Sequence, residues 1–257
     1  MEGENKIMEN ITLEENAKKM DRIKTGIPGL DELIQGGFPR GSFINLAGGP
    51  GVGKTIFASQ FLAEGIKNGE KGLFITVEQT ADEISAQAKQ FGWDFDKWEN
   101  EGKLKIVSLD PQRLFEIRAL DELKILIENN RYDRIVIDSI TSFVSSPISP
   151  ATIADFTDKG IQPYTFMELR RANVALLINL MKQHGITTLG ISQKIEGIPG
   201  ETIETSTEFK SDGLIVLNAN AIGKILNRTL QIKKLRKTQI DGIPHNFDFT
   251  DKGISLK

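Results

Sequence analysis

The sequence contains no cysteine and only two histidines among its 257 residues. Without cysteine the chain can form no disulfide, no thiolate-bound zinc or iron–sulfur site, and no cysteine nucleophile. Two histidines nearly exclude a metal centre built from imidazole alone. These classes of chemistry are therefore set aside.

Long apolar segments are also missing. The longest apolar run, Val174 to Met181, is interrupted by Asn179 and is far shorter than the roughly 20 residues that span a bilayer. Residues 1–20 contain five glutamates and lack the apolar core of a signal peptide. The sequence therefore predicts a soluble, cytoplasmic protein that does not bind membranes.

A strong excess of charge of one sign is absent as well. The 32 Lys and Arg residues nearly balance the 35 Asp and Glu residues, so the chain is not a polycation that binds nucleic acid through bulk charge. Hydrophobic residues make up 39% of the chain, enough for one sizeable core. We expect a single domain over residues 21–257, preceded by a polar tail or short helix at 1–20.

From residue 21 onward, short apolar runs alternate with stretches of helical periodicity, a pattern typical of β-α units. The expected strands are 42–47, 73–77, 104–108, 134–138, 186–191, 214–217, 225–235 and 245–249. The expected helices are 54–68, 80–92 with a capping box at Thr80, 120–127 and 166–184, with long loops at 145–165 and 194–211. The pattern predicts an α/β fold with a mainly parallel central sheet flanked by helices and extended by antiparallel C-terminal strands.

A glycine-rich segment between the first expected strand and helix fits the pattern G-x-x-x-x-G-K-[ST]. Its glycines allow the backbone N–H groups to face phosphate oxygens at a helix N-terminus. Lys54 can reach the β- and γ-phosphates, and Thr55 can ligate Mg²⁺. The expected nucleotide-binding residues are Gly48, Gly49, Pro50, Gly51, Val52, Gly53, Lys54, Thr55 and Ile56. A glycine-rich turn that happens to precede a lysine is the alternative.

Polar residues end three further strands at the same expected edge of the sheet. Asp138 follows the aliphatic run at 134–137 and is a candidate Mg²⁺ partner, or a strand-ending cap. Glu78 is the best candidate for the base that activates water, or a loop carboxylate beside the capping box. Gln193 is a candidate sensor of the γ-phosphate, although one polar residue after a strand is common.

These segments occur in a recognisable order along the chain. The succession consists of Thr25–Gly41 (TGIPGLDELIQGGFPRG), the phosphate loop, Phe74–Glu78 (FITVE), Ile135–Ser139 (IVIDS) and Lys234-Leu-Arg236. It resembles the RecA/RadA superfamily of P-loop ATPases, specifically the KaiC-like branch, from about residue 21 to the C-terminus. The motifs are specific as an ordered set and less so singly.

The resemblance implies an ATPase whose sites lie between subunits of a ring, usually a hexamer. By this resemblance Lys54 and Thr55 hold phosphate and Mg²⁺, Asp138 binds Mg²⁺ through water, and Glu78 is the base. Lys234 and Arg236 reach a neighbour's γ-phosphate. Strand alternation independently places 234 and 236 on one face, although two solvated charges on an exposed ribbon would look the same.

Two departures from the family pattern affect the expected activity. KaiC-like proteins commonly have two consecutive glutamates where this chain has Glu78-Gln79, which can slow or retune hydrolysis. The clock protein's phosphorylated Ser-Thr pair corresponds here to Glu208-Phe209, which disfavours autokinase activity, although Thr205 to Thr207 lie nearby.

Three functional interpretations remain open. The first is an Mg²⁺-dependent ATPase acting as a regulatory or motor-like module. The second is a RecA/RadA paralogue that binds single-stranded DNA. Here the loop from Lys194 to Lys210 has two lysines against four glutamates, which weakens phosphate attraction. Residues 224–240 carry six cations and no acid, but the resemblance commits part of them to ATP. The third is a protein-partner module or autokinase with little turnover.

Overall fold

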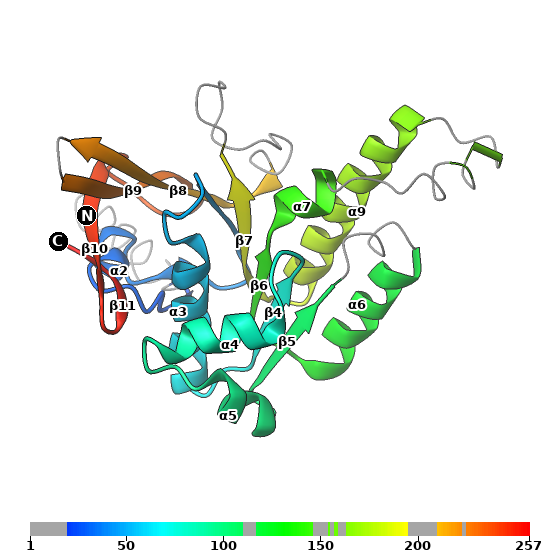
Figure 1. Ribbon diagram of the computed structural model, residues 1–257, viewed down its shortest axis with the longest axis horizontal. Helices are drawn as coiled ribbons and strands as arrows, with labels where there is room; N and C mark the ends of the chain where they lie inside the picture. The colour runs from blue at the N-terminus through cyan, green and yellow to red at the C-terminus, as the bar shows by residue number, and fades with distance from the viewer. Residues whose placement is uncertain are drawn as a thin grey trace, which may run out of the picture.

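The computed structural model describes residues 20–109, 117–145, 154, 157–158, 163–194, 210–222 and 225–257. Within these residues nine strands form one mixed sheet in the order β11-β10-β9-β8-β3-β7-β6-β4-β5 (Figure 1). Five neighbouring strands run parallel to one another: β3 (Phe43–Gly48), β4 (Gly72–Thr76), β5 (Leu104–Ser108), β6 (Arg134–Asp138) and β7 (Thr187–Gln193). The predicted mainly parallel α/β sheet is confirmed.

The C-terminal part of the chain widens this sheet on one side. Strand β8 (Gly213–Ile222) runs parallel to β3, and β9 (Ile225–Leu235), β10 (Pro244–Thr250) and β11 (Gly253–Leu256) follow as antiparallel neighbours. The predicted antiparallel extension is therefore confirmed. Strand β8 is longer than predicted, and β11 was not predicted because four residues carry little periodic signal.

Helices cover both faces of the sheet. On one side lie α3 (Lys54–Lys67), α4 (Ala81–Lys89) and α5 (Phe95–Asn100) (Figure 1). On the other lie α6 (Ile117–Asn130), α7 (Ile140–Ser145) and α9 (Pro163–Gln183). In the described residues no helix combines the length and apolarity needed to cross a membrane.

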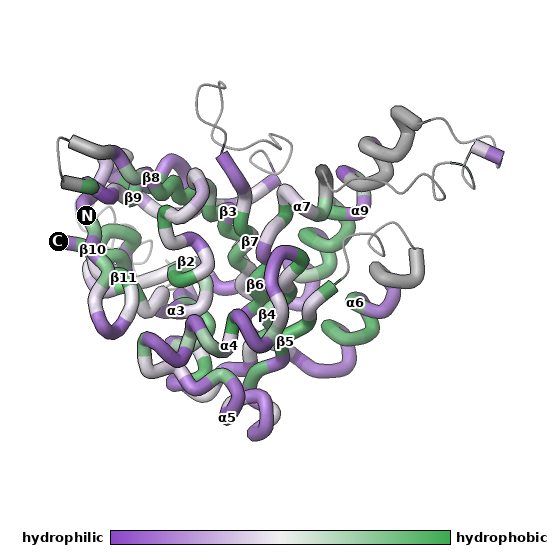
Figure 2. The backbone as a smooth tube through the Cα atoms, in the orientation of Figure 1, coloured by the Kyte–Doolittle hydropathy of each residue, from purple (hydrophilic) through white to green (hydrophobic). Residues whose placement is uncertain are grey.

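The core consists of two main clusters, one on each face of the sheet. In β4 the side chain of Phe74 joins the cluster under α3, whereas Leu73 and Ile75 join the cluster under α6 and α9. Strands buried on both faces read as continuous apolar runs, and Figure 2 shows the central strands as predominantly hydrophobic. This explains why the sequence located the buried strands well.

Short elements account for most of the missed structure. Helix α5 begins after Asp94, whose carboxylate accepts a hydrogen bond of 3.1 Å from the amide of Lys97. Helices α2 (Leu30–Leu33), α5 and α7 have six residues or fewer, too short to show helical periodicity. The same holds for the two-residue strands β1 (Arg22–Ile23) and β2 (Phe38–Pro39), which pair with each other. The predictions for residues 1–19 and for most of the loops at 145–165 and 194–211 lie outside the described residues.

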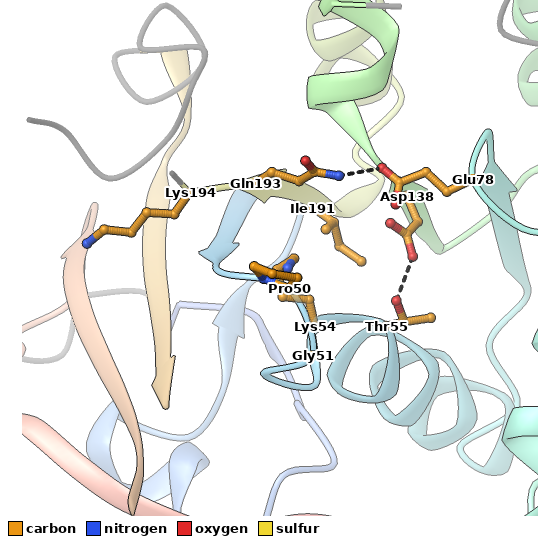
Figure 3. A pocket seen from close by; sticks show the side chains of 9 residues that line it. All are labelled: Pro50, Gly51, Lys54, Thr55, Glu78, Asp138, Ile191, Gln193 and Lys194. Atoms are coloured by element: carbon orange, nitrogen blue, oxygen red, sulfur yellow. Dashed lines mark hydrogen bonds between the residues drawn. The ribbon is translucent and has the colours of Figure 1, made fainter. Parts of the chain in front are cut away.

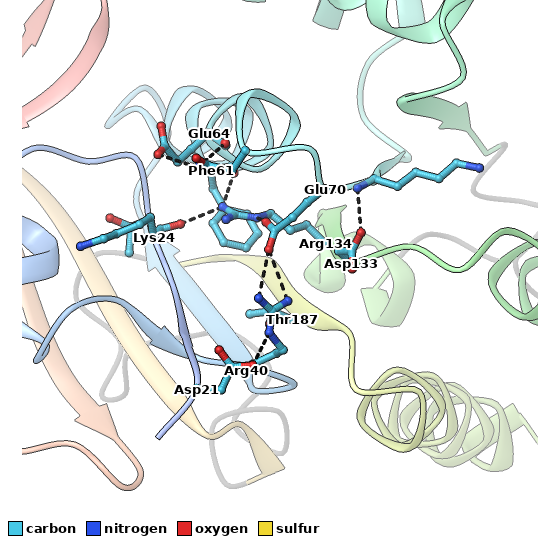
Figure 4. Close-up of polar contacts among 12 residues, drawn as sticks. Asp21, Lys24, Arg40, Phe61, Glu64, Glu70, Asp133, Arg134 and Thr187 are labelled. Atoms are coloured by element: carbon cyan, nitrogen blue, oxygen red, sulfur yellow. Dashed lines mark hydrogen bonds and ion pairs between the residues drawn. The ribbon is translucent and has the colours of Figure 1, made fainter. Parts of the chain in front are cut away.

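A buried arginine joins the N-terminal segment, α3 and β6 at the amino-terminal edge of the sheet (Figure 4). The side chain of Arg134 is almost fully buried, and its guanidinium donates to Glu70 and to the carbonyl oxygens of Lys24 (2.8 Å) and Phe61 (2.7 Å). A Cβ at Gly65 would lie 2.4 Å from Arg134 Nε, so only glycine fits there. This network fixes α3, which begins at Lys54, against β6, which ends at Asp138.

Candidate nucleotide-binding site

The loop between β3 and α3 has the backbone conformation that its glycines predict. Gly51 and Gly53 have positive φ angles of 70° and 104°, a region that other residues rarely adopt. At Gly53 a Cβ would also lie 2.5 Å from Cζ of Phe249 on β10, so the close approach of that ring requires glycine as well. The loop leads into the N-terminus of α3, where free backbone N–H groups favour anions.

Lys54, the first residue of α3, turns back over this loop. Its Nζ donates to the carbonyl oxygens of Gly48 at 3.0 Å and Gly49 at 2.6 Å. Burial lowers the pKa of Lys54, while the nearby carboxylates of Asp138 and Glu78 act in the opposite direction. The ammonium group is thus held at the loop that is expected to wrap phosphate.

Thr55 and Asp138 form a direct contact at the floor of the pocket (Figure 3). The Thr55 hydroxyl donates to Asp138 Oδ2 at 2.8 Å, which joins the start of α3 to the end of β6. Burial raises the pKa of Asp138 to about 6, and the Thr55 hydrogen bond opposes this rise. A hydroxyl and a carboxylate oxygen at this distance are the hard oxygen donors that Mg²⁺ prefers alongside substrate phosphates, so the residues fit that ion.

Glu78 faces the same pocket and receives three hydrogen bonds on one oxygen. Its Oε1 accepts from the hydroxyls of Ser139 and Ser142 (2.7 Å) and from Nε2 of Gln193 (3.1 Å). The side chain itself is exposed, so it is held in place while remaining accessible to solvent. The structure thus brings both predicted carboxylates and the predicted sensor amide to one edge of the sheet.

These side chains line a cavity of about 610 Å³. Its lining residues are Pro50, Gly51, Lys54, Thr55, Glu78, Asp138, Ile191, Gln193 and Lys194. Sequence analysis missed Ile191 and Lys194, and also the two serines that contact Glu78. The serines could have been found from the order Asp138-Ser-Ile-Thr-Ser142, because hydroxyls that follow a strand-ending carboxylate are near the same site. In Figure 3, Lys194 extends away from Glu78.

The remaining predicted phosphate-binding residues do not line the cavity. Val52 is buried in the core cluster under α3, and Ile56 packs against the same cluster. Gly48 lies so close to β8 that a Cβ would be 2.6 Å from the carbonyl oxygen of Leu217. Gly48 ends β3 and Val52 lies between β3 and α3, whereas Ile56 lies on α3, and contact of these residues with nucleotide stays a prediction.

Lys234 and Arg236 do not line the cavity of their own chain. Lys234 is paired with Leu214 near the amino-terminal end of β8, whereas the phosphate loop leaves β3 at Gly48, which is paired with Leu217. A register shift between Leu214 and Ile215 displaces the end of β9, and Arg236 lies one residue beyond that strand. Both cations therefore lie toward the opposite edge of the sheet from the pocket.

Arg228 on β9 is a further cation beside the phosphate loop. Its guanidinium lies 4.7 Å from the ring centroid of Phe249, the ring that closes over Gly53. The Nε atom is buried and has no hydrogen-bond partner among the described residues. The ring of Phe249, covered by the guanidinium of Arg228, therefore lies next to the site. Arg228 belongs to the basic segment at 224–240.

Three features of this site define the class of P-loop ATPases with a RecA-like fold. They are the strand-loop-helix geometry, the lysine that contacts the loop, and the strand-ending aspartate that accepts a hydrogen bond from the neighbouring threonine. A family model described as the KaiC ATPase matches residues 23–257, and the chain belongs to this family.

Similar proteins of known sequence agree with this assignment. A UPF0273 protein of Thermotoga maritima is 31% identical over 254 residues, covering 91% of this chain and 95% of that protein. The circadian clock oscillator protein KaiC of Synechococcus elongatus is 33% identical over 244 residues, covering 91% of this chain and 44% of that protein. The chain thus spans less than half of the clock protein.

A solved structure has the same fold. The crystal structure of a KaiC-like protein from the hyperthermophilic archaeon Pyrococcus horikoshii OT3 has a TM-score of 0.77 and 31% sequence identity to this chain. The match covers 93% of this chain and 99% of that chain. The predicted KaiC-like, RecA-type ATPase domain is therefore confirmed, and the protein is an ATP-binding P-loop ATPase of the RecA superfamily.

Proposed function

We propose that this protein is an Mg²⁺-dependent ATP hydrolase of the KaiC-like branch that acts as a single-domain ring. The observation that carries the proposal is the convergence of Lys54, the Thr55–Asp138 pair and the exposed Glu78 on one cavity. Phosphoryl transfer to water requires phosphate binding, charge neutralisation and a positioned nucleophile. Lys54 serves the first requirement, the Thr55–Asp138 pair the second, and Glu78 the third.

The loop and Lys54 bind the triphosphate. Phosphate oxygens replace the carbonyl groups of Gly48 and Gly49 as partners of the ammonium group, which then faces the β- and γ-phosphates. Thr55 and Asp138 would hold Mg²⁺, which would supply positive charge to neutralise the phosphates. The ring of Phe249, with the guanidinium of Arg228 over it, packs beside the loop at Gly53.

Glu78 orients and deprotonates the attacking water. Among the described contacts its hydrogen bonds all reach Oε1, which leaves Oε2 to accept a proton from water. Gln193 donates to the same carboxylate, so its amide connects the base to β7 and can respond to the γ-phosphate. The proton taken up by Glu78 returns to solvent across the open side of the cavity.

We further propose that Lys234 and Arg236 complete the site of a neighbouring subunit. Their position away from their own chain's pocket supports this role, because in a head-to-tail ring one subunit's far surface meets the next subunit's pocket. Cations that approach the γ-phosphate stabilise the charge that develops during transfer. The cysteine-free composition is compatible with a cytoplasmic ring of this kind.

The DNA-binding and autokinase interpretations stay predictions. The segment 195–209, which contains Glu208-Phe209 and the nearby hydroxyl residues, lies outside the described residues. No contact in the described residues favours either activity over ATP hydrolysis by a ring.

The proposal is tested by measuring particle mass with and without ATP and Mg²⁺ and phosphate release on the same sample. Lys54→Ala should abolish release by at least about 100-fold, because phosphate binding is lost. Lys67→Ala, at the exposed C-terminal end of the same helix, is the matched control and should release phosphate at the parent rate. A parent protein that stays monomeric and hydrolyses ATP at full rate would refute the ring, and one without turnover would refute the hydrolase.

A further inference from the structure

The turn that follows β9 is held in place from two sides. The strand ends at Leu235, and Arg236 and Lys237 form a turn in which Lys237 has a φ of 59°. The Arg236 side chain is about half exposed, and its guanidinium lies 3.5 Å from Asp212 Oδ1, a long contact to a carboxylate that Lys182 also pairs with. A cation that must reach another subunit from such a turn needs its backbone held by other contacts.

One side of the turn is attached to the start of β8. The Arg236 amide donates to the carbonyl oxygen of Asp212 at 2.7 Å, and Lys234 Nζ donates to the carbonyl oxygen of Ser211 at 2.6 Å. The Asp212 carboxylate is itself fixed by the Phe43 amide at 3.0 Å and by Lys182 at 2.8 Å. This side therefore rests on the central sheet.

The other side of the turn is held by Arg22 on β1. Its Nη2 donates to the carbonyl oxygen of Lys237 at 3.0 Å, and its Nη1 donates to Oγ1 of Thr238 at 3.0 Å. The same guanidinium donates to the carbonyl oxygens of Ile34 (3.1 Å) and Gly37 (3.0 Å), and to Oε1 of Gln35 (3.2 Å). Arg22 therefore joins the segment at 34–37 to the turn, where Lys237 lies 215 positions after Arg22 in the chain.

We infer that Arg22 is a positioning residue for Arg236, holding the turn from which this cation reaches the phosphates of the neighbouring subunit. The inference rests on the proposed completion of the site between subunits. A planar guanidinium that reaches two acceptors on the turn fixes its orientation, which a single point charge cannot do. Without Arg22 the turn loses its attachment to β1, while its contacts with Ser211 and Asp212 on the other side remain, so Arg236 is held from one side instead of two.

The expected effect is on catalysis and not on binding of ATP. A catalytic group displaced by about 1 Å can cost on the order of 100-fold in rate, so Arg22→Ala should lower kcat by at least about tenfold. The affinity for ATP should stay within about twofold, because the phosphate loop of each subunit is unchanged. Arg40→Ala is the matched control, since Arg40 also anchors the N-terminal segment through Asp21 and Glu70 but does not contact the turn.

A second pair of variants probes the same contact with less risk to folding. Thr238→Val removes the one acceptor of Arg22 Nη1 that lies on the turn, whereas Thr238→Ser keeps it. Thr238→Val should therefore lower kcat, and Thr238→Ser should restore the parent value, with equal thermal unfolding midpoints in both. A kcat equal to the parent in Arg22→Ala and in Thr238→Val would overturn the inference.

Mixed rings decide in which subunit Arg22 acts. Lys54→Ala subunits lack a working loop but keep their cations, and Arg236→Ala subunits keep the loop, so an equal mixture should restore about one quarter of the interfaces. Adding Arg22→Ala to the Lys54→Ala subunits should lower this restored activity by the same factor of at least about ten. Adding it to the Arg236→Ala subunits should leave it unchanged.

Each outcome of the mixing experiment has one meaning. A fall in activity only when Arg22→Ala accompanies the intact cations supports the inference. If Arg22→Ala has the same effect in both kinds of subunit, or no effect in either, the inference about Arg22 is contradicted. Completion of the site between subunits is then still supported by the activity of the simple mixture. No restored activity in the simple mixture refutes completion between subunits, and the role of Arg22 with it.

Discussion

Replacing Glu78 by glutamine gives the sharpest test of the catalytic mechanism. Ser139, Ser142 and Gln193 all donate to Oε1 of this carboxylate. In the variant the amide oxygen takes the position of Oε1, because Nε2 of Gln193 donates there and both serine hydroxyls can keep donating to an oxygen. The nitrogen then faces the water that Oε2 faced, and it cannot accept a proton.

The size of the effect follows from this forced orientation. General base catalysis contributes about 100-fold to 10,000-fold, so loss of the base should raise the barrier by about 3 to 5 kcal/mol. Shape and hydrogen bonds are otherwise conserved, and Glu78 does not touch Lys54 or Thr55 through any described hydrogen bond. ATP affinity and thermal stability should therefore change little.

The assay combines steady-state phosphate release with equilibrium binding of ATP and Mg²⁺ on the same preparation. Glu32→Gln is the matched control, because it removes the same charge from the exposed surface of α2. The control should release phosphate at the parent rate. Equal rates in Glu78→Gln and the parent would remove Glu78 from the mechanism, and loss of ATP binding would show that it acts in binding.

Three further predictions concern the metal site, a helix cap and the buried ion pair. Asp138→Asn removes the carboxylate that accepts from Thr55 and that we propose as a partner of Mg²⁺, so Mg²⁺ should no longer tighten ATP binding by a measurable factor in titration calorimetry. Thr80→Ala removes the capping box of α4 and should cost about 1 kcal/mol in denaturant unfolding without changing turnover. Glu70→Gln leaves the buried Arg134 without its charged partner and should lower the free energy of unfolding by about 3 kcal/mol. An unchanged denaturation midpoint in either of the last two variants would contradict the energetic argument for it.

The central architecture could be predicted because its signals are local. The strands 104–108 and 134–138 agree with the structure to the residue: 134–138 is a fully buried, mostly aliphatic run, and 104–108 begins with the alternation of buried and exposed residues typical of a strand. The capping box at Thr80 forms as predicted, because it involves residues only three positions apart. Short elements such as α7 escaped because they owe their structure to neighbours rather than to periodicity.

The candidate site was predictable for a related reason. Parallel strands place their carboxyl ends at one edge of the sheet, so polar residues that follow Thr76, Ile137 and Ser192 had to meet there. Which of them touch was not predictable. The contacts of Glu78 with Ser142 and Gln193 span 64 and 115 positions, and they depend on side-chain directions that only the packed sheet defines.

The amino-acid order alone thus determined the phosphate loop, the run of buried strands and the carboxylates that end them, because each is encoded within a few neighbouring positions. Tertiary structure decided how these pieces meet: the closure of Phe249 over Gly53, and the displacement of Lys234 and Arg236 from their own pocket. It also decided the hydrogen bonds by which Arg22 contacts a turn 215 residues away. Such contacts depend on how distant segments pack in three dimensions, and no periodicity along the chain records them.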